Sequence, residues 1–385
     1  MNLMAPAQSS SRSSTPTRGQ GSGLRASGGT ITGHLLKITR ERIPSTQRQL
    51  AERLNMDVTT VQSWETGRRP LTAVSLAQFQ TVCRHLLGLN ADPELVALLD
   101  VASHADAVIA CALGNASPRH HDLQGHPLGQ WVFTRAATHM IVWALTGTSP
   151  AAIPPPPASI PRRRGPSPSS PLLAETERRR LFTHLRRCAE IADRAGDGGT
   201  LLRRQAVYLA SYDNAPDTHA WLAHMQRPVT FTTTSTSAWS EARSVATSLT
   251  RYGEYDRLWA FIEHGMGDDF GELANLNYWA YWLGMDSVPR ADDGFMAVRS
   301  AHRWDAGALL RALTGRLDRD LGCLDLNVHS VWALLTWRPG LAAADSSLSV
   351  NLAGRVSELL DTGTVSPRAR RELEQVHYGL RLNGM

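Results

Sequence analysis

Residues 46–70 carry the pattern that most restricts how this chain can fold. In TQRQLAERLNMDVTTVQSWETGRRP, two short segments with apolar residues at helical spacing flank Asn55–Asp57. Asn tolerates the left-handed backbone of a tight turn, and the Asp57 carboxylate can cap a following helix. We therefore expect two short helices that cross at a tight turn, with Ala51 at their close approach. The apolar contacts of this crossing are assigned to Leu50, Leu54, Met56, Val61 and Trp64.

The segment resembles the Cro/repressor-type, or XRE, helix-turn-helix family of bacterial transcriptional regulators. The resemblance covers about 60 of the 385 residues, and Asn55 stands where the family usually has Gly. It implies a domain at residues 29–90 that binds double-stranded DNA. The matching positions are Thr46–Gln47, Leu50–Ala51, the apolar triplet Leu54, Val61 and Trp64, and the Trp-Glu-x-Gly-x-Arg run from Trp64 to Arg69.

Helical geometry and the resemblance together assign roles to the second helix and its flanks. With Val61 and Trp64 facing inward, four side chains are expected outward, where the major groove would present base edges. Glu65 is expected to support local structure. The predicted base-reading residues are Val58, Thr59, Gln62 and Ser63, and the predicted phosphate-binding residues are Gln47, Thr66, Arg68 and Arg69.

The charge distribution agrees with a polyanion binding near the N-terminus. Residues 1–90 hold eleven basic and four acidic side chains, a formal charge of +7, whereas the whole chain carries +5. The remaining 295 residues therefore carry −2. Residues 1–28 are Ser/Gly/Thr/Arg-rich and predict a disordered basic arm, either inert or in non-specific contact with DNA.

The rest of the chain predicts an all-α protein. A helix is expected from Asp92–Pro93 to Leu113 and another from Pro127, which makes residues 91–146 a helical extension. Residues 147–171 contain nine prolines and predict an extended linker outside any packed core. Residues 172–385 predict a helical bundle or irregular solenoid for regulation or oligomerisation. Only residues 228–237 resemble a strand, and this segment is also compatible with a loop. Its later helices are expected at 238–253, 255–265, 271–284, 305–317, 323–337, 347–361 and 366–382.

One aromatic cluster stands out in the C-terminal part. Tyr278 and Trp279 precede Trp282 by four and three residues, so the three side chains crowd one side of a helix. The spacing favours aromatic core packing between helices. The functional alternative is the wall of a pocket for a small-molecule or peptide effector.

Other chemistry has little support. His120, His121 and His126 lie in a polar loop in which Asp122 is the one further ligand at matching spacing, so no metal or other cofactor is expected. The four cysteines stand far apart and read as core residues of a reduced compartment. No catalytic motif is present, so the protein is not expected to be an enzyme. Neither a membrane span nor a secretory signal is recognised, which favours a cytoplasmic protein without membrane contact.

Together these features predict a sequence-specific, DNA-binding transcriptional regulator. One such DNA-binding unit covers too few base pairs for genomic specificity, so a homodimer on an inverted repeat is expected, with half-sites about 34 Å apart or a multiple of it. Residues 91–146 or the C-terminal domain would form the dimer interface. The alternative is a DNA-binding adaptor or maintenance protein whose helical C-terminal domain binds a protein partner.

Overall fold

The computed structural model describes residues 28–114, 123, 125–155, 169–225, 235–286, 288–299, 304–318, 322–363 and 365–383. The predicted arm up to residue 27, and most of the strand-like segment at 228–237, lie outside these ranges. Over the described ranges all regular structure is helical, which confirms the all-α prediction.

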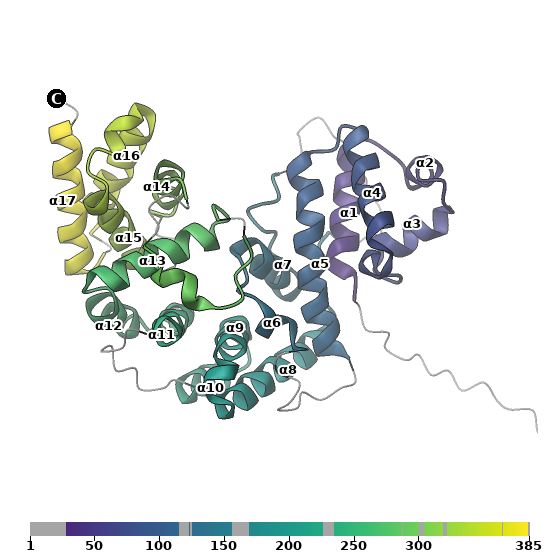
Figure 1. Cartoon of the computed structure of the whole chain (residues 1–385), viewed down its shortest axis with the longest axis horizontal. Helices are drawn as coiled ribbons and strands as arrows, with labels where there is room; N and C mark the ends of the chain where they lie inside the picture. The colour runs from purple at the N-terminus through teal and green to yellow at the C-terminus, as the bar shows by residue number, and fades with distance from the viewer. Residues whose placement is uncertain are drawn as a thin grey trace, which may run out of the picture.

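The described helices follow one another with short connections (Figure 1). The seven helices expected after residue 237 are present as α11 to α17, close to the predicted positions. Thr236 and Ser237, which the strand-like segment included, begin α11. The α-helices are α1 (Thr30–Arg42), α2 (Gln47–Arg53), α3 (Val58–Glu65), α4 (Leu76–Gly88), α5 (Pro93–Leu113), α6 (Pro127–Gln130), α7 (Arg135–Thr146), α8 (Glu175–Arg194), α9 (Thr200–Ala210), α10 (Thr218–His224), α11 (Thr236–Leu249), α12 (Asp256–Gly265), α13 (Asp269–Trp282), α14 (Ala306–Thr314), α15 (Leu324–Trp337), α16 (Ser346–Thr362) and α17 (Pro367–Asn383).

Side-chain caps explain why many of these helices begin where the sequence predicts. The Asp57 carboxylate accepts the backbone N–H of Thr59 at 2.7 Å, and Asp92 accepts that of Glu94 at 2.9 Å. The Ser366 hydroxyl does the same for α17. Each cap satisfies a backbone donor that has no partner inside the helix.

The single helix predicted from residue 127 is wrong, because the chain breaks between α6 and α7. The Gln205 side chain accepts the N–H of Phe133 at 2.7 Å and donates to the carbonyl of Leu128 at 2.8 Å. The N–H of Val132 donates to the carbonyl of Arg290 at 2.7 Å. Backbone groups that a continuous helix would pair internally are thus satisfied by distant residues.

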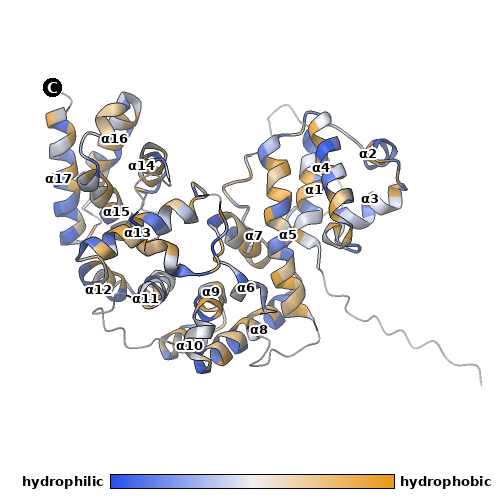
Figure 2. Ribbon diagram, viewed as in Figure 1, coloured by the Kyte–Doolittle hydropathy of each residue, from blue (hydrophilic) through white to orange (hydrophobic). Residues whose placement is uncertain are grey.

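Helix α5 lies at the centre of the N-terminal half and packs against α1, α7 and α8. Figure 2 shows hydrophobic residues along its length. Its Asp106 is fully buried and accepts the N–H groups of Ile31 at 3.0 Å and Thr32 at 2.9 Å, at the start of α1. Burial raises the pKa of Asp106 to about 6, against the opposing effect of these hydrogen bonds. This carboxyl group therefore ties α1 to α5.

By length and composition alone, α5 is the one helix among the described residues that could cross a membrane. Over half of its most apolar window is buried inside the protein. Its apolar residues thus already have partners within the chain.

The hydrophobic core does not divide at the Pro-rich segment. One cluster of buried residues runs from Ile31 to Leu249, and a second runs from Val132 to Leu380. Ile153 and Leu173, at the described ends of the Pro-rich region, are buried in the first cluster. The expectation that residues 147–171 stay outside any core is therefore wrong at Ile153. Ile153, which lies between Pro150 and Pro154, reaches the core even though prolines exclude helix.

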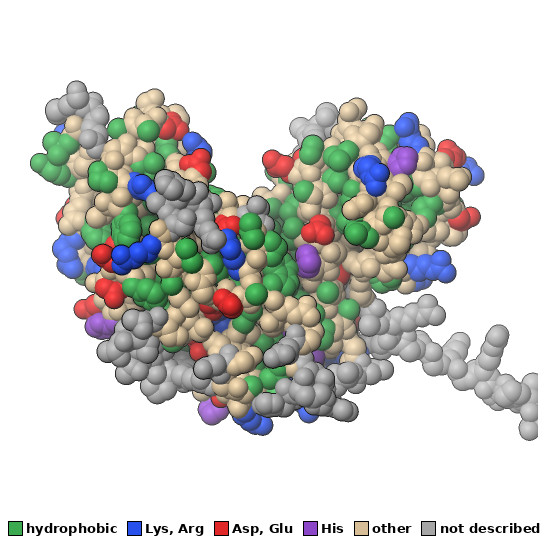
Figure 3. All heavy atoms as spheres, viewed as in Figure 1, with side chains coloured by type: hydrophobic (Ala, Val, Ile, Leu, Met, Phe, Trp, Pro, Cys, Tyr) green, Lys and Arg blue, Asp and Glu red, His purple; other side chains and the backbone are tan. Residues whose placement is uncertain are grey.

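The described helices together form an arch. Figure 1 shows α1 to α5 in one arm, α12 to α17 in the other, and α8 to α10 along the base. The space-filling view in Figure 3 is hollowed between the two arms. Helices α2 and α3 lie at the outer end of the first arm, away from the hollow.

The tightest approach between α1 and α3 is at Gly33, where a Cβ atom would lie 2.1 Å from the carbonyl oxygen of Trp64. We expect Gly33→Ala to lower the free energy of unfolding by about 2 kcal/mol or more, because two backbones must separate. Gly354→Ala is the control, since that helical glycine has nothing within 4 Å; it should be neutral or stabilising by up to about 1 kcal/mol. Urea unfolding followed by circular dichroism would measure both. Equal stabilities of the two variants would contradict the close packing.

Candidate functional site

Helices α2 and α3 form a compact pair across a short turn. Asn55 adopts a φ of 51°, the left-handed conformation predicted for this turn. Thr46 and Gln49 bond reciprocally at the start of α2, the Thr hydroxyl accepting an N–H and the Gln carbonyl accepting the Thr46 N–H. Val61 and Trp64 are buried, as expected. The remaining predicted contacts, Leu50, Ala51, Leu54 and Met56, also lie in or against the first core cluster.

A buried ion pair fixes α3 against α1. The Arg40 guanidinium donates to both carboxylate oxygens of Glu65, at 2.5 and 3.0 Å, and both side chains are almost fully buried. Arg40 also donates to the carbonyl of Ser45 at 2.7 Å, just before α2. The predicted structural role of Glu65 is confirmed. Removing one partner of such a pair costs about 3–5 kcal/mol, because the other charge is left buried alone.

Gln47 joins this network. Its side-chain amide donates to Glu65 at 2.6 Å. The sequence predicted a contact between Gln47 and a DNA phosphate, but the amide is directed at a carboxylate within the protein. In this structure Gln47 links α2 to α3.

The outward face of α3 carries fewer of the predicted base-reading residues than expected. Thr59 and Gln62 are exposed and Val58 is half-buried. Ser63 is only 5% exposed, so the prediction that it faces outward is wrong. Its hydroxyl donates to the carbonyl of Thr59 at 2.6 Å and accepts from the Arg68 guanidinium at 2.9 Å. Ser63 therefore orients Arg68, and its own hydroxyl is not available for contact with a base.

The residues that follow α3 are exposed and basic. Arg68 and Arg69 are both exposed, and no hydrogen bond or ion pair of the Arg69 side chain is found among the described residues. The Thr66 hydroxyl is exposed but donates within α3, to the carbonyl of Gln62 at 2.8 Å. Two guanidinium groups thus flank the exposed part of α3.

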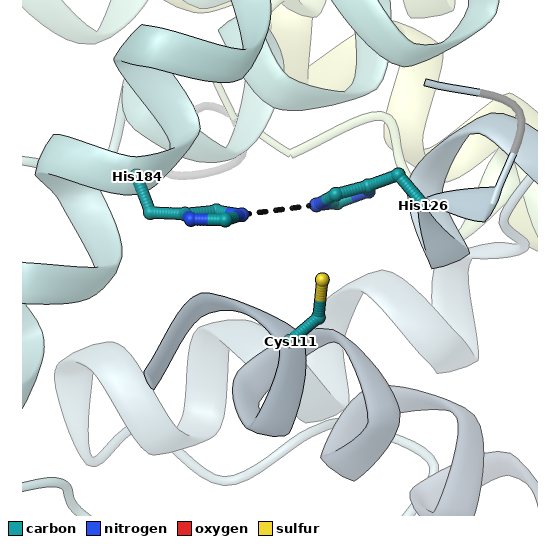
Figure 4. A group of neighbouring side chains, drawn as sticks. All are labelled: Cys111, His126 and His184. Atoms are coloured by element: carbon teal, nitrogen blue, oxygen red, sulfur yellow. Dashed lines mark hydrogen bonds between the residues drawn. The ribbon is translucent and has the colours of Figure 1, made fainter. Parts of the chain in front are cut away.

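A second cluster of ligand-type side chains lies at the junction of α5, α6 and α8. Figure 4 shows Cys111, His126 and His184 pointing toward one another, and their potential ligand atoms lie within 4.8 Å. The sequence groups His126 only with His120 and His121, which lie outside the described residues. The grouping with Cys111 and His184 has no local sequence signal, because the three residues lie up to 73 positions apart and come from separate elements.

Hydrogen bonding accounts for the two histidines without an ion. The Nδ1 atom of His126 accepts the N–H of Leu128 at 3.1 Å, so in the neutral ring Nε2 carries the proton. That Nε2 atom lies 3.2 Å from Nε2 of His184 and can donate to it. Burial, and then the charge of His184, lower the pKa of His126 to about 4. The pair is therefore neutral at pH 7, and a metal at this position would have to displace the proton of His126.

The four cysteines are unpaired, but the prediction that they are buried in the core is confirmed only for Cys188, since Cys83, Cys111 and Cys323 are half-buried. Cys188 is buried one helical turn after His184, and burial raises the pKa of its thiol to about 12. Such a thiol stays protonated and unreactive at neutral pH.

The aromatic residues predicted on α13 fall into two groups. Trp279 is buried and its indole N–H donates to Ser330 at 2.9 Å, which fits the core-packing interpretation. Tyr278 and Trp282 stack with centroids 5.8 Å apart and line a small pocket with residues of α7, α9 and α11. The structure thus places two of the three at a pocket.

No protein-family model matches the chain, and neither a curated protein nor a solved structure matches it. The resemblance noted above therefore rests on the residues of this sequence alone.

The buried histidine pair predicts a specific pH dependence of stability. An unfolded histidine takes up its proton near pH 6.5, whereas folded His126 does so only near pH 4. The unfolded state therefore binds more protons between these values, and stability should fall as the pH drops through this range. The loss attributable to His126 is about 3 kcal/mol. His126→Asn, which keeps a capping oxygen, should lose less stability than the wild type in urea titrations from pH 7 to 4.5. If the variant lost as much stability as the wild type over this pH range, protonation of His126 would not be the cause of the loss.

Proposed function

We propose that the chain is a sequence-specific regulator of transcription that acts in the cytoplasm by inserting α3 into the major groove of duplex DNA. The observation that carries this proposal is the exposed pair Thr59 and Gln62 on α3, next to the exposed Arg68 and Arg69. A helix with polar side chains outward and guanidinium groups at its end suits base contacts with adjacent phosphate contacts. The excess positive charge of residues 1–90 supports the same interpretation.

The contacts divide by residue type. Gln62 can pair with the adenine edge, Thr59 can hydrogen-bond permissively, and the Val58 side chain can contact a thymine methyl group. Arg68 and Arg69 would bind phosphates, with Ser63 holding Arg68 in place. Gln47 would act indirectly, through its bond to Glu65. Because none of the base-reading residues is an arginine, DNA shape and dimerisation should share the specificity.

We further propose that the chain dimerises through α17. The extension at residues 91–146 offers limited apolar surface, because about half of α5, including most of its large apolar residues, and most of α7 are buried within the chain. Helix α17 instead exposes Tyr378 and Leu382, at 66% and 59%, one helical turn apart. An apolar pair on a surface helix of this kind suits an isologous contact between two copies.

The DNA contacts can be tested with two single variants. Arg69→Ala should weaken binding to every duplex and lower the salt slope by about 1, because one phosphate contact is lost. Gln62→Ala should change affinity by about 1–3 kcal/mol at one base pair and leave the salt slope unchanged. Binding would be measured by fluorescence anisotropy at several salt concentrations, on duplexes selected from a random library. Arg194→Ala, at an exposed position on α8, is the charge-matched control and should bind like the wild type. The same effect of all three substitutions would overturn the assignment to α3.

The dimer is tested by sedimentation velocity of Tyr378→Ser/Leu382→Ser. We expect a dimer for the wild type and a monomer for the double variant, which should also bind single half-sites in place of the full inverted repeat. Val350→Ser, which replaces a comparably exposed residue on α16, is the control and should remain dimeric. If the wild type sedimented as a monomer both free and bound to DNA, the proposed dimer would be wrong.

A further inference from the structure

A group of arginines surrounds the aromatic face of α13, at the meeting point of α7, α9, α11 and α13. None of these residues belongs to the proposed DNA contacts. Four guanidinium groups gather here although their positions span 182 residues. They are Arg135 of α7, Arg243 of α11, Arg251 after α11 and Arg316 after α14; His139 of α7 lies among them.

Three of the four arginines, Arg243, Arg251 and Arg316, lie over aromatic rings. The Arg243 guanidinium is 3.9 Å from the centroid of Tyr278 and 4.8 Å from that of Trp279. Arg316 lies 4.7 Å from the same Trp279 ring, and Arg251 lies 4.7 Å from Tyr208. Cation–π contacts of this kind hold guanidinium groups in place but leave their positive charge uncompensated.

Carboxylates do not balance these charges. No ion pair joins Arg135, Arg243, Arg251 or Arg316 to an acidic residue within the described ranges. Arg204 of the neighbouring pocket differs, since it donates to Asp293 at 2.7 Å. Arg243 is 4% exposed, and its Nη2 atom is buried without a hydrogen-bond partner. Of the four, Arg243 is buried, Arg135 and Arg316 are half-buried, and Arg251 is exposed. A buried guanidinium without a counter-charge is costly, so the arrangement favours the binding of an anion.

The titration behaviour of the neighbours agrees with this imbalance. Burial, together with the charges of Arg135 and Arg243, lowers the pKa of Arg316 to about 10. Burial and three arginines, Arg135 first, lower the pKa of His139 to about 4. The charged forms of Arg316 and His139 are thus disfavoured by burial and by neighbouring arginines, as expected beside uncompensated positive charge. Arg251 differs, because, against the effect of burial, the nearby Tyr208 and Tyr212 hydroxyl groups raise its pKa.

We propose that this arginine–aromatic site binds a small phosphate-bearing ligand of the nucleotide class. Planar guanidinium forks match phosphate oxygens in pairs, and several of them together suit a di- or triphosphate. Tyr208 and Trp282 are half-buried beside the arginines and meet edge to face, with ring centroids 6.0 Å apart, so one ring face can stack on a base. Arg251 is exposed and bonded to the Tyr212 hydroxyl at 2.8 Å, which places one guanidinium where a ligand can reach it from solvent.

The ligand class is tested by isothermal titration calorimetry of the full chain with ATP, GTP, inorganic pyrophosphate, adenosine and guanosine. We expect at least one nucleoside triphosphate to bind about tenfold or more tightly than pyrophosphate, and the nucleosides not to bind. Equal affinities for pyrophosphate and both triphosphates would overturn the nucleotide assignment, and so would no binding of any of the five compounds.

Variants separate a ligand site from a purely structural cluster. Arg243→Met keeps most of the side-chain volume and removes an uncompensated charge. It should lower triphosphate affinity about tenfold or more without lowering the melting temperature. Arg186→Met is the matched control: Arg186 also lies over a tryptophan, 5.4 Å from the centroid of Trp221, but pairs with Asp213 at 2.9 Å. This control should lower the melting temperature and leave ligand affinity unchanged. A destabilised Arg243→Met protein that still binds triphosphate would contradict the proposal.

The DNA measurements keep this site distinct from the proposed DNA contacts. Arg243→Met should bind duplex DNA like the wild type, and Arg69→Ala should keep its triphosphate affinity. Arg243→Met could instead lose affinity for duplex DNA while triphosphates bind neither the wild type nor this variant. In that case the arginines would belong to a nucleic-acid surface, and the nucleotide proposal would be wrong. If the wild type and Arg243→Met both bound nucleotide but neither bound duplex DNA, only the proposed function would be overturned.

Discussion

The buried pair of Arg40 and Glu65 is the interaction on which the proposed DNA-reading surface depends. It joins α1 to α3 within a region where Gly33 already lets the two backbones touch, and Gln47 extends it to α2. Helix α1 is in turn held at its start by Asp106 of α5, and α5 packs against α8 at the base of the arch. A chain of buried polar contacts and helix packing therefore connects the exposed end of α3 to the rest of the protein. The position of Thr59 and Gln62 follows from these contacts more than from the short α3 helix itself, which would be marginal in isolation.

Local features made much of the fold predictable from the sequence. Caps such as Asp57 and Asp92 mark helix starts through a bond to a residue two positions away, so neighbouring sequence contains the information. The turn at Asn55 was predictable for the same reason. The break between α6 and α7 was not, because Gln205 and the carbonyl of Arg290 create it from far along the chain. Ile153 similarly enters the core although its neighbouring prolines suggested an isolated linker.

The candidate sites show the same division. Periodicity identified the inward residues Val61 and Trp64, but it assigned Ser63 outward because spacing does not reveal that Arg68 covers this hydroxyl. The aromatic spacing on α13 was visible, whereas the two arginines over those rings, Arg243 and Arg316, come from two other segments and carry no joint signal in the sequence. An unpaired guanidinium can be recognised only when all of its neighbours are known. The two proposals therefore rest on different grounds: one on a local motif with a rigid support, the other on charges that folding brings together.

The most direct test of the central claim is chemical interference on a duplex that the purified chain selects from a random library. Dimethyl sulfate methylates guanine N7 in the major groove and adenine N3 in the minor groove, so one experiment reports which groove matters. If α3 reads the major groove, N7 methylation should block binding within each half-site, and N3 methylation there should have little effect. Interference confined to adenine N3, or no interference at any position, would contradict the account.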